Sequence, residues 1–268
     1  MQENHSFQSL GEVLAGNFPQ PNKEKKASTR ADSVAEFRCQ LCHNIGWVLS
    51  DVKPGLPDSK QLSRCPCMKE QDDAERKARF LRLCRLPQGS EDRTFERFEV
   101  RPCLEEAYKA AMDMAQGKLK WLTLMGDVDT GKSHLAVSIA RKWLQRDRPA
   151  RYVAVPKLLD ELRRGYHPGA DMSYDEEFYF YEHVDLLVLD DLGMESPTPW
   201  AQEKLDMLVN SRYENALPLV VTTNLDFDLI SPRIASRLQR ASFGKVVNIK
   251  AIDYSIYRER VIMPGSEA

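Results

Sequence analysis

Residues 126–133 follow the pattern G-x-x-x-x-G-K-[ST], a glycine-bordered loop that requires a strand before it and a helix after it. The flanks predict both elements. Residues 121–125 are an apolar run typical of a buried strand, and from 133 to about 145 apolar residues recur at helical spacing. A chance glycine turn, the alternative, would not need these flanks. The residues of the predicted site are Gly126, Asp127, Val128, Asp129, Thr130, Gly131, Lys132, Ser133 and His134.

This loop has the chemistry of a phosphate site. Its backbone N–H groups and the positive end of the following helix can converge on an anion. Lys132 can reach the outer phosphates of a nucleotide, and the Ser133 hydroxyl can ligate Mg²⁺. Asp127 and Asp129 add two carboxylates to the same loop, so we expect both to face solvent, away from the phosphates. The loop therefore predicts binding of ATP and Mg²⁺.

Strands and helices alternate from about residue 90 onward. Besides residues 121–125, apolar runs at 151–155, 184–189, 219–223 and 245–249 predict four more strands, with amphipathic helices between them. Strands that are apolar on both faces are typical of a parallel sheet covered by helices. The alternation predicts an α/β fold, a three-layer domain with a parallel five-stranded sheet.

Two acids, Asp190 and Asp191, end the strand predicted at 184–189. Parallel strands place such residues at the same edge as the phosphate loop. We therefore expect Asp190 to hold Mg²⁺ together with Ser133, and Asp191 to orient or deprotonate the attacking water. A pair of aspartates can instead cap the next helix. Asn224, which follows the strand at 219–223, is the polar residue best placed to touch the γ-phosphate or the water.

Four of the six cysteines form two close pairs, Cys39 with Cys42 and Cys65 with Cys67. Two such pairs supply the four sulfur ligands that tetrahedral zinc takes, so we predict a structural Zn²⁺ site. The second pair is more tightly spaced than is usual. His43 is a second-choice ligand, and free thiols or a redox pair are the alternatives.

The remaining sequence sets the domain boundaries. Residues 1–36 are polar and predicted to be flexible, with one short helical pattern that would either lie on its own domain or dock a partner protein. Residues 37–88 are predicted to form the zinc-binding domain and a charged helix, and residues 89–268 an ATP-binding domain. No apolar run reaches the roughly 18 residues of a membrane span, and no secretory signal opens the chain, so we expect a cytoplasmic protein without a membrane partner. A net charge of −2 argues neither for nor against a nucleic-acid partner.

Taken together, the motifs resemble the AAA+ ATPases of the DnaC/DnaI helicase-loader group and the related IstB transposition ATPases, over roughly residues 90–262. The stretches that carry the resemblance are G-K-S-H-L at 131–135, V-D-L-L-V-L-D-D-L-G at 184–193, R-Y-E-N-A-L-P-L-V-V-T-T-N at 212–224, R-I-A-S-R-L at 233–238 and D-Y-S-I-Y-R at 253–258. By this resemblance Asn224 is the sensor residue, and Arg237 is the arginine finger that reaches the γ-phosphate of a neighbouring subunit, with Arg233 a lesser candidate. In isolation both arginines would be read as solvated. Asp129 replaces the usual glycine of the loop, and the chain leaves no room for a separate lid domain.

The resemblance also implies a function. Loaders of this group oligomerise through the AAA+ domain and place the ring-shaped replicative helicase on single-stranded DNA, and we expect slow, oligomer-dependent hydrolysis of ATP to ADP and phosphate. Zinc-stabilised amino-terminal domains engage the helicase in DnaI-type loaders, whereas IstB-type proteins carry a helical part there, so the cysteine pairs favour a loader. The alternatives are a transposition ATPase that delivers a transposase to target DNA and a nucleotide-gated adaptor with little turnover.

Overall fold

The computed structural model describes residues 39–43, 45–51, 60–251 and 253–257, and the chain divides into two compact units, Met1–Cys67 and Met68–Ala268. The segment 1–36, for which the sequence offers a short docking helix, lies outside the described residues. None of the helices in the described part of the chain combines the length and the apolar character that a membrane crossing requires.

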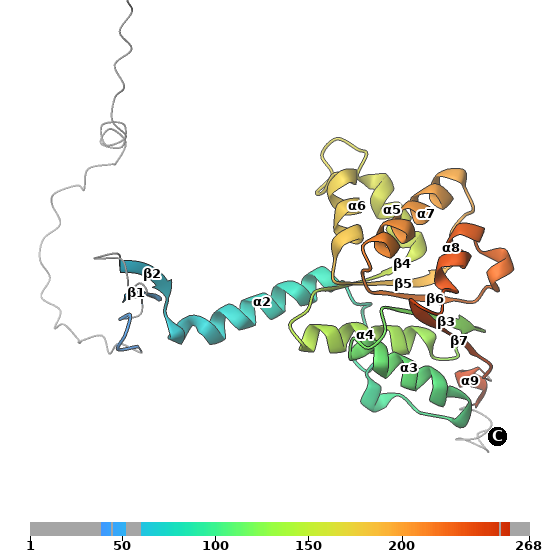
Figure 1. Ribbon diagram of the computed structural model, residues 1–268, viewed down its shortest axis with the longest axis horizontal. Coiled ribbons are helices and arrows are strands. Elements are labelled where there is room, and N and C mark those ends of the chain that lie inside the picture. Colours follow the sequence, from blue (N-terminus) through green and yellow to red (C-terminus); the bar gives the residue numbers. More distant parts are fainter. Residues whose placement is uncertain (1–38, 44, 52–59, 252, 258–268) are drawn as a thin grey trace, which may run out of the picture. The chain divides into compact units, whose positions relative to one another are not determined.

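The first unit contains an antiparallel hairpin (Figure 1), and the cysteine pairs flank it in the sequence. Strand β1 (Trp47–Asp51) pairs with β2 (Lys60–Arg64), and Cys39 and Cys42 precede β1 while Cys65 follows β2. An isolated two-stranded hairpin is marginally stable at best in water. A cross-link between the segments that flank it would therefore add stability that the hairpin lacks.

A five-stranded parallel sheet lies at the centre of the second unit, in the strand order β4-β5-β6-β3-β7 (Figure 1). Every pairing in it is parallel, which confirms the predicted fold class. The strands β3 to β6 are buried along nearly their whole length, as expected when helices cover both faces. The strand bounds are Trp121–Gly126 for β3, Ala150–Ala154 for β4, Leu186–Leu192 for β5, Leu219–Thr223 for β6 and Gly244–Ile249 for β7.

Helices cover the two faces of this sheet in two groups (Figure 1). Helices α3 and α4 pack with Leu122 and Val188 in one core cluster, whereas α5, α6, α7 and α8 pack with Leu187 and Leu189 in the other. Neighbouring residues of β5 fall into different clusters because successive side chains of a strand point to opposite faces. The helix bounds are α3 Glu105–Ala115, α4 Lys132–Gln145, α5 Val155–Arg164, α6 Tyr174–His183, α7 Pro199–Glu214, α8 Pro232–Leu238 and α9 Tyr254–Tyr257, with short 3-10 turns at Pro66–Met68, Phe95–Arg97, Pro102–Leu104 and Phe227–Leu229.

The charged helix α2 (Lys69–Cys84) falls in the second unit, although the sequence grouped it with the cysteine-rich region. Its carboxyl end accounts for the difference. Cys84 is fully buried in the core cluster of α3 and α4, and the Leu83 carbonyl accepts a hydrogen bond of 3.1 Å from Arg151 on β4. The helix ends at Arg85, whose left-handed backbone (φ 51°) turns the chain away.

Candidate functional site

The phosphate loop lies between β3 and α4, and its two glycines are required by close approaches. Gly126 (φ 143°) lies so near β7 that an added Cβ would meet the Ile249 carbonyl oxygen at 2.4 Å. Gly131 (φ 94°) has the same role on the other side, where a Cβ would meet the Phe98 ring at 2.9 Å. A side chain at either position would displace the loop, which explains why the pattern has glycine at both ends.

Lys132 begins α4 and folds back into its own loop. The Nζ donates hydrogen bonds to the carbonyl oxygens of Gly126 (2.9 Å) and Asp127 (2.5 Å), and it lies 3.4 Å from the Thr130 hydroxyl. Burial lowers the pKa of the ammonium, and the nearby carboxylates of Asp191 and Asp190 oppose that shift. The loop therefore places a positive charge at the amino end of a helix, which is a suitable environment for phosphate.

Asp190, at the end of β5, is the polar centre of the site. One carboxylate oxygen accepts from the Ser133 hydroxyl at 3.0 Å and from the Thr222 hydroxyl at 2.5 Å, and the other accepts from the Tyr152 hydroxyl. The Ser133 bond joins the two motifs that the sequence predicted to meet. A hydroxyl and a carboxylate side by side are the oxygen donors that Mg²⁺ takes, so these residues fit the ion that the nucleotide requires.

Asp191 follows in a distorted part of the strand. The pairing of β5 with β6 shifts register between Leu189 and Leu192, and Asp191 has a left-handed backbone (φ 57°) while its N–H donates to the Thr222 hydroxyl at 2.9 Å. Burial raises the pKa of the Asp191 carboxyl, Asp190 adds to this, and Lys132 opposes it. A carboxyl with a raised pKa at a cavity wall is suited to accept a proton.

A cavity of about 1400 Å³ joins the two motifs. Asn224, half-buried just after β6, lines it together with both aspartates. Gly126 and Asp127 instead line a smaller neighbouring cavity of about 460 Å³, which Asn224 also borders. The predicted residues that line the larger cavity are Val128, Asp129, Thr130, Gly131, Lys132, Ser133, His134, Asp190, Asp191 and Asn224.

The two acids of the loop are both exposed. Asp129 does more than face solvent, because its carboxylate accepts two hydrogen bonds from Ser255 of α9. His134 is held on the other side of the loop, where its Nε2 lies 2.9 Å from the Thr94 carbonyl and its ring packs edge-on against Phe98. Burial lowers the pKa of this imidazole.

Arg237 is not among the residues that line the larger cavity. Its guanidinium donates to the Asn210 side chain and, at 3.1 Å, to the Arg233 carbonyl, and it packs 5.7 Å from the ring centre of Tyr213. Arg233 itself is exposed. Any contact between Arg237 and a nucleotide would therefore have to involve the site of another chain or a rearranged α8.

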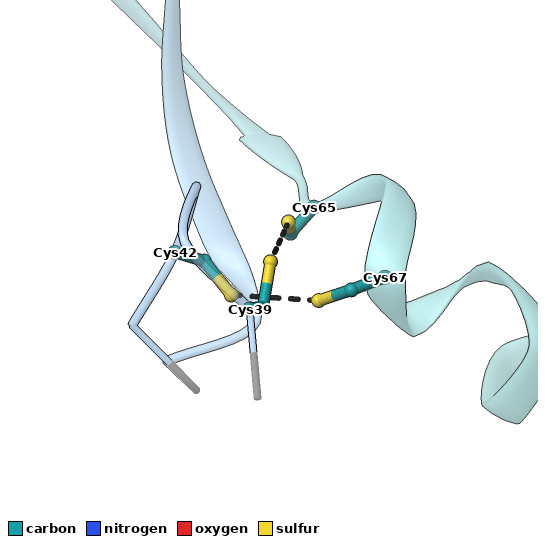
Figure 2. Close-up of side chains that lie close together, drawn as sticks. All are labelled: Cys39, Cys42, Cys65 and Cys67. Atoms are coloured by element: carbon teal, nitrogen blue, oxygen red, sulfur yellow. Dashed lines mark hydrogen bonds between the residues drawn. The ribbon is translucent and has the colours of Figure 1, made fainter. Parts of the chain in front are cut away.

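The four cysteines of the first unit converge on one point (Figure 2). The sulfurs of Cys39 and Cys65 lie 3.7 Å apart and those of Cys42 and Cys67 lie 3.4 Å apart, and all four fall within 4.8 Å of one another. Sulfurs about 2.3 Å from a tetrahedral zinc ion lie about 3.8 Å from each other. His43 is exposed, and the described cluster consists of the four cysteines. The arrangement fits a Cys₄ zinc site.

A family model described as IstB-like ATP binding protein matches residues 67–235, more than half of the chain. The chain belongs to the IstB-like ATP-binding family. The matched segment contains the phosphate loop, both aspartates and Asn224, and it ends just before Arg237.

Replication proteins are among the proteins to which the chain is similar. The chain is 23% identical over 196 residues to the replicative helicase loader DnaI of Bacillus subtilis (strain 168), which covers 70% of this chain and 62% of that protein, less than two thirds of its length. A crystal structure of the DnaC helicase loader superposes with a TM-score of 0.54 at 20% identity, covering 61% of this chain and all of that one. The replication initiator DnaA, bound to AMPPCP and single-stranded DNA, gives a TM-score of 0.53 at 23% identity, covering 64% of this chain and 55% of that chain. These structures show a shared AAA+ fold, which agrees with the family resemblance.

Tyr152 is the residue of this IstB-like site that the sequence did not single out. It lies on β4 among ordinary strand residues, and its hydroxyl reaches Asp190 because β4 pairs with β5, with Ala154 opposite Asp190. Burial and the neighbouring Asp190 charge raise the pKa of the Tyr152 hydroxyl, so it stays a donor at neutral pH. A polar aromatic residue near the carboxyl end of a strand was the available signal. The catalytic and binding roles of the site residues themselves stay predictions.

Proposed function

We propose that this protein hydrolyses ATP at the edge of the sheet where the loop, β5 and β6 end. The observation that carries the proposal is the contact between Ser133 and Asp190, which unites the two motifs beside the cavity. Lys132 and the loop amides would bind the β- and γ-phosphates. Ser133 and Asp190 would hold Mg²⁺, which when bound neutralises charge on the phosphates.

Asp191 and Asn224 would act on the water. Asn224 would orient it, and Asp191, whose pKa is raised by burial, would take its proton as the oxygen bonds to the γ-phosphorus and the bond to the bridging oxygen breaks. ADP leaves with the bridging oxygen, and the γ-phosphoryl leaves as phosphate. Arg237 would stabilise the charge on the γ-phosphate of a neighbouring subunit, so turnover would rise with assembly.

The biological role that we propose is loading of a ring-shaped replicative helicase onto single-stranded DNA. The similarity to DnaI over 70% of the chain supports it, as does the shared fold with a DnaA structure that holds single-stranded DNA. The four-cysteine cluster supports a loader over a transposition ATPase, because the resemblance links a zinc-bearing amino-terminal domain to DnaI-type loaders. In this view the first unit, which carries the four cysteines, is the partner-binding module, and the second unit, which includes α2, is the ATPase domain.

Turnover of purified full-length protein tests the enzymatic part. We expect Mg²⁺-dependent release of phosphate from ATP. The rate per chain should increase with protein concentration and on addition of single-stranded DNA. Lys132→Ala should abolish it, and Lys142→Ala, a half-buried lysine on the same helix that forms an ion pair with Glu96, should not. If Lys132→Ala binds ATP as the unaltered chain does, the site assignment is wrong, and if no condition gives turnover, the protein is the nucleotide-gated adaptor instead.

Co-purification tests the role. The full chain is immobilised with ATP, with ADP or without nucleotide and offered purified ring helicases and, separately, a transposase. Retention of a helicase that depends on ATP supports the loader, whereas retention of the transposase alone supports the transposition ATPase.

Metal analysis tests the cysteine cluster. We expect one zinc ion per chain in the unaltered protein and its loss in Cys39→Ser, while Cys103→Ser, an exposed cysteine of the second unit, should keep it. Melting of the ATPase unit should be unchanged in Cys39→Ser, because all four sulfurs belong to the first unit. A redox pair would instead give a disulfide by mass and no zinc.

A further inference from the structure

The phosphate loop is tied to the carboxyl-terminal helix α9 through Asp129. The Asp129 carboxylate accepts from the Ser255 hydroxyl at 2.7 Å and from the Ser255 N–H at 3.0 Å, and the Asp129 carbonyl accepts from the Tyr254 N–H at 2.9 Å. The Ser255 N–H is shared with Asp253, whose carboxylate lies 2.8 Å from it. The hydroxyl of Ser255 is therefore the one side-chain donor among these contacts of Asp129.

α9 is itself anchored to the segment that precedes α3. Arg101 is buried and lies 4.6 Å from the ring centre of Tyr257 and 5.8 Å from that of Tyr254, and the Tyr254 hydroxyl donates to Glu99 at 3.3 Å. These contacts fix α9 independently of the loop. Because α9 is fixed in this way, the Ser255 hydroxyl can restrain the Asp129 carboxylate.

A carboxylate in this loop would repel the phosphates of a bound triphosphate if it faced them. The loop amides must face the phosphates, and a charge a few ångströms from them would repel the ligand unless it is turned away. Burial raises the pKa of Asp129, but the hydrogen bonds from Ser255, the hydrogen bond with Asp253 and the charge of Arg101 outweigh this and lower the pKa, which favours the carboxylate. Its backbone is left-handed (φ 56°), and its carboxylate contacts Ser255 of α9.

We propose that Ser255 is a positioning residue for nucleotide binding, which holds the Asp129 carboxylate away from the phosphates. The inference rests on the proposed ATP site and adds to it a residue more than a hundred positions away along the chain. Without the hydroxyl the carboxylate loses its hydrogen bond of 2.7 Å to the Ser255 side chain, and it samples orientations nearer the ligand. The penalty should be larger for ATP than for ADP, since ATP carries more negative charge.

Calorimetric titration of the full chain with MgATP and with ADP provides the test. We expect Ser255→Ala to weaken ATP binding about fivefold and ADP binding less, and Ser255→Thr, which keeps the hydroxyl, to restore it. Asp129→Asn should bind ATP at least as tightly as the unaltered chain, and Ser255→Ala should have no effect in the Asp129→Asn background. Ser236→Ala, an exposed serine of α8, is the matched control.

The dependence of ATP binding on ionic strength and the melting temperatures of the variants distinguish this electrostatic role from a structural one. Raising the ionic strength from about 0.05 to 0.5 M shortens the screening length severalfold, so the defect of Ser255→Ala should shrink. The proposal is overturned if Ser255→Ala binds ATP normally, if its defect persists in the Asp129→Asn background, or if Asp129→Asn alone weakens binding at an unchanged melting temperature. If one of these contrary results is obtained while the unaltered chain binds ATP and Lys132→Ala does not, the inference about Ser255 fails and the ATP site stands. If the unaltered chain does not bind ATP, both fail.

Discussion

The two ends of the parallel sheet each bury a cation, and they use it differently. At the carboxyl end Lys132 is 5% exposed and is held by two loop carbonyls beside a large cavity. At the amino end Arg212 is fully buried and donates to four carbonyls, those of Tyr181, Glu182, Val184 and Pro218, at 2.6–3.1 Å. Both ions replace water with backbone oxygens, but only Lys132 borders space for a ligand and two carboxylates.

A cation that lies within a sequence motif can therefore be structural, as Arg212 is. Arg212 opens the stretch R-Y-E-N-A-L-P-L-V-V-T-T-N, which the sequence associates with ATPase chemistry, yet its contacts are structural. The guanidinium joins the segments that lead into β5 and β6, since Val184 lies two residues before β5 and Pro218 lies immediately before β6. Because the amino ends of β5 and β6 are fixed, the positions of Asp190 on β5 and of Asn224 just after β6 are fixed as well.

Removal of the Arg212 guanidinium should give the largest effect on folding. Arg212→Met removes the guanidinium donors from four carbonyls, of which the Pro218 carbonyl keeps the Leu187 N–H, and a buried carbonyl left without a partner costs about 1–3 kcal/mol, so we expect the free energy of unfolding to fall by about 3 kcal/mol or more. Urea denaturation followed by tryptophan fluorescence measures it, with the exposed Arg82→Met as control. A loss below about 1 kcal/mol would contradict the structural role and remove the contrast between the two ends.

Lys132→Ala should show the opposite pattern. We expect ATP turnover to fall at least about a hundredfold, because the phosphates lose their buried cation, which corresponds to about 2.7 kcal/mol of stabilisation. Its urea midpoint should stay near that of the unaltered chain, since the carbonyls it leaves border the cavity and can bind water. Phosphate release and denaturation are measured on the same preparation. A variant that unfolds as readily as Arg212→Met would show that Lys132, too, is chiefly structural.

Tyr152 provides a finer test at the carboxyl end. Tyr152→Phe removes one of the three hydroxyl donors on Asp190, so the carboxylate is held less firmly while the loop is untouched. We expect the turnover number to fall about three- to tenfold with little change in KM, as for a group that orients the catalytic machinery. Steady-state kinetics against Tyr179→Phe, an exposed tyrosine, provide the comparison. A rise in KM alone would place Tyr152 in nucleotide binding.

The sequence predicted those features that depend on neighbours along the chain. The loop, the strand before it and the helix after it belong to one local pattern, and the parallel topology then brings Asp190 to Ser133, which the structure does. The five-stranded parallel sheet is confirmed for the same reason, because its apolar runs report burial on both faces.

What the sequence did not predict depends on side chains that meet across elements. Tyr152 reaches Asp190 through the pairing of β4 with β5, and Ser255 reaches Asp129 from the far end of the chain. No spacing in the sequence encodes either contact. The placement of α2 in the second unit likewise follows from the burial of Cys84, which the charged surface of that helix conceals.

The smallest expected effect concerns the ionisation of Asp191, which lies near the carboxyl end of β5. Asp185, which immediately precedes the amino end of β5, provides a matched comparison. Burial and Asp190 raise the pKa of Asp191, so the folded chain binds a proton more tightly there than the unfolded chain, whose aspartates titrate near 3.9. Stability therefore falls as pH rises through the window between the two pKa values, and the penalty is fully present above the raised pKa of the folded chain.

Asp191→Asn removes that penalty. We expect its melting temperature, without nucleotide and with chelator, to exceed that of the unaltered chain at pH 7–8, and the gain to disappear as pH is lowered toward 4. Asp185→Asn should show no gain, because Asp185 forms a half-exposed ion pair with Arg148 at 3.3 Å whose loss costs about 1 kcal/mol at most. If Asp191→Asn and Asp185→Asn change the melting temperature equally, ionisation of Asp191 does not destabilise the folded chain. The proposal that Asp191 accepts a proton would then lose its physical basis.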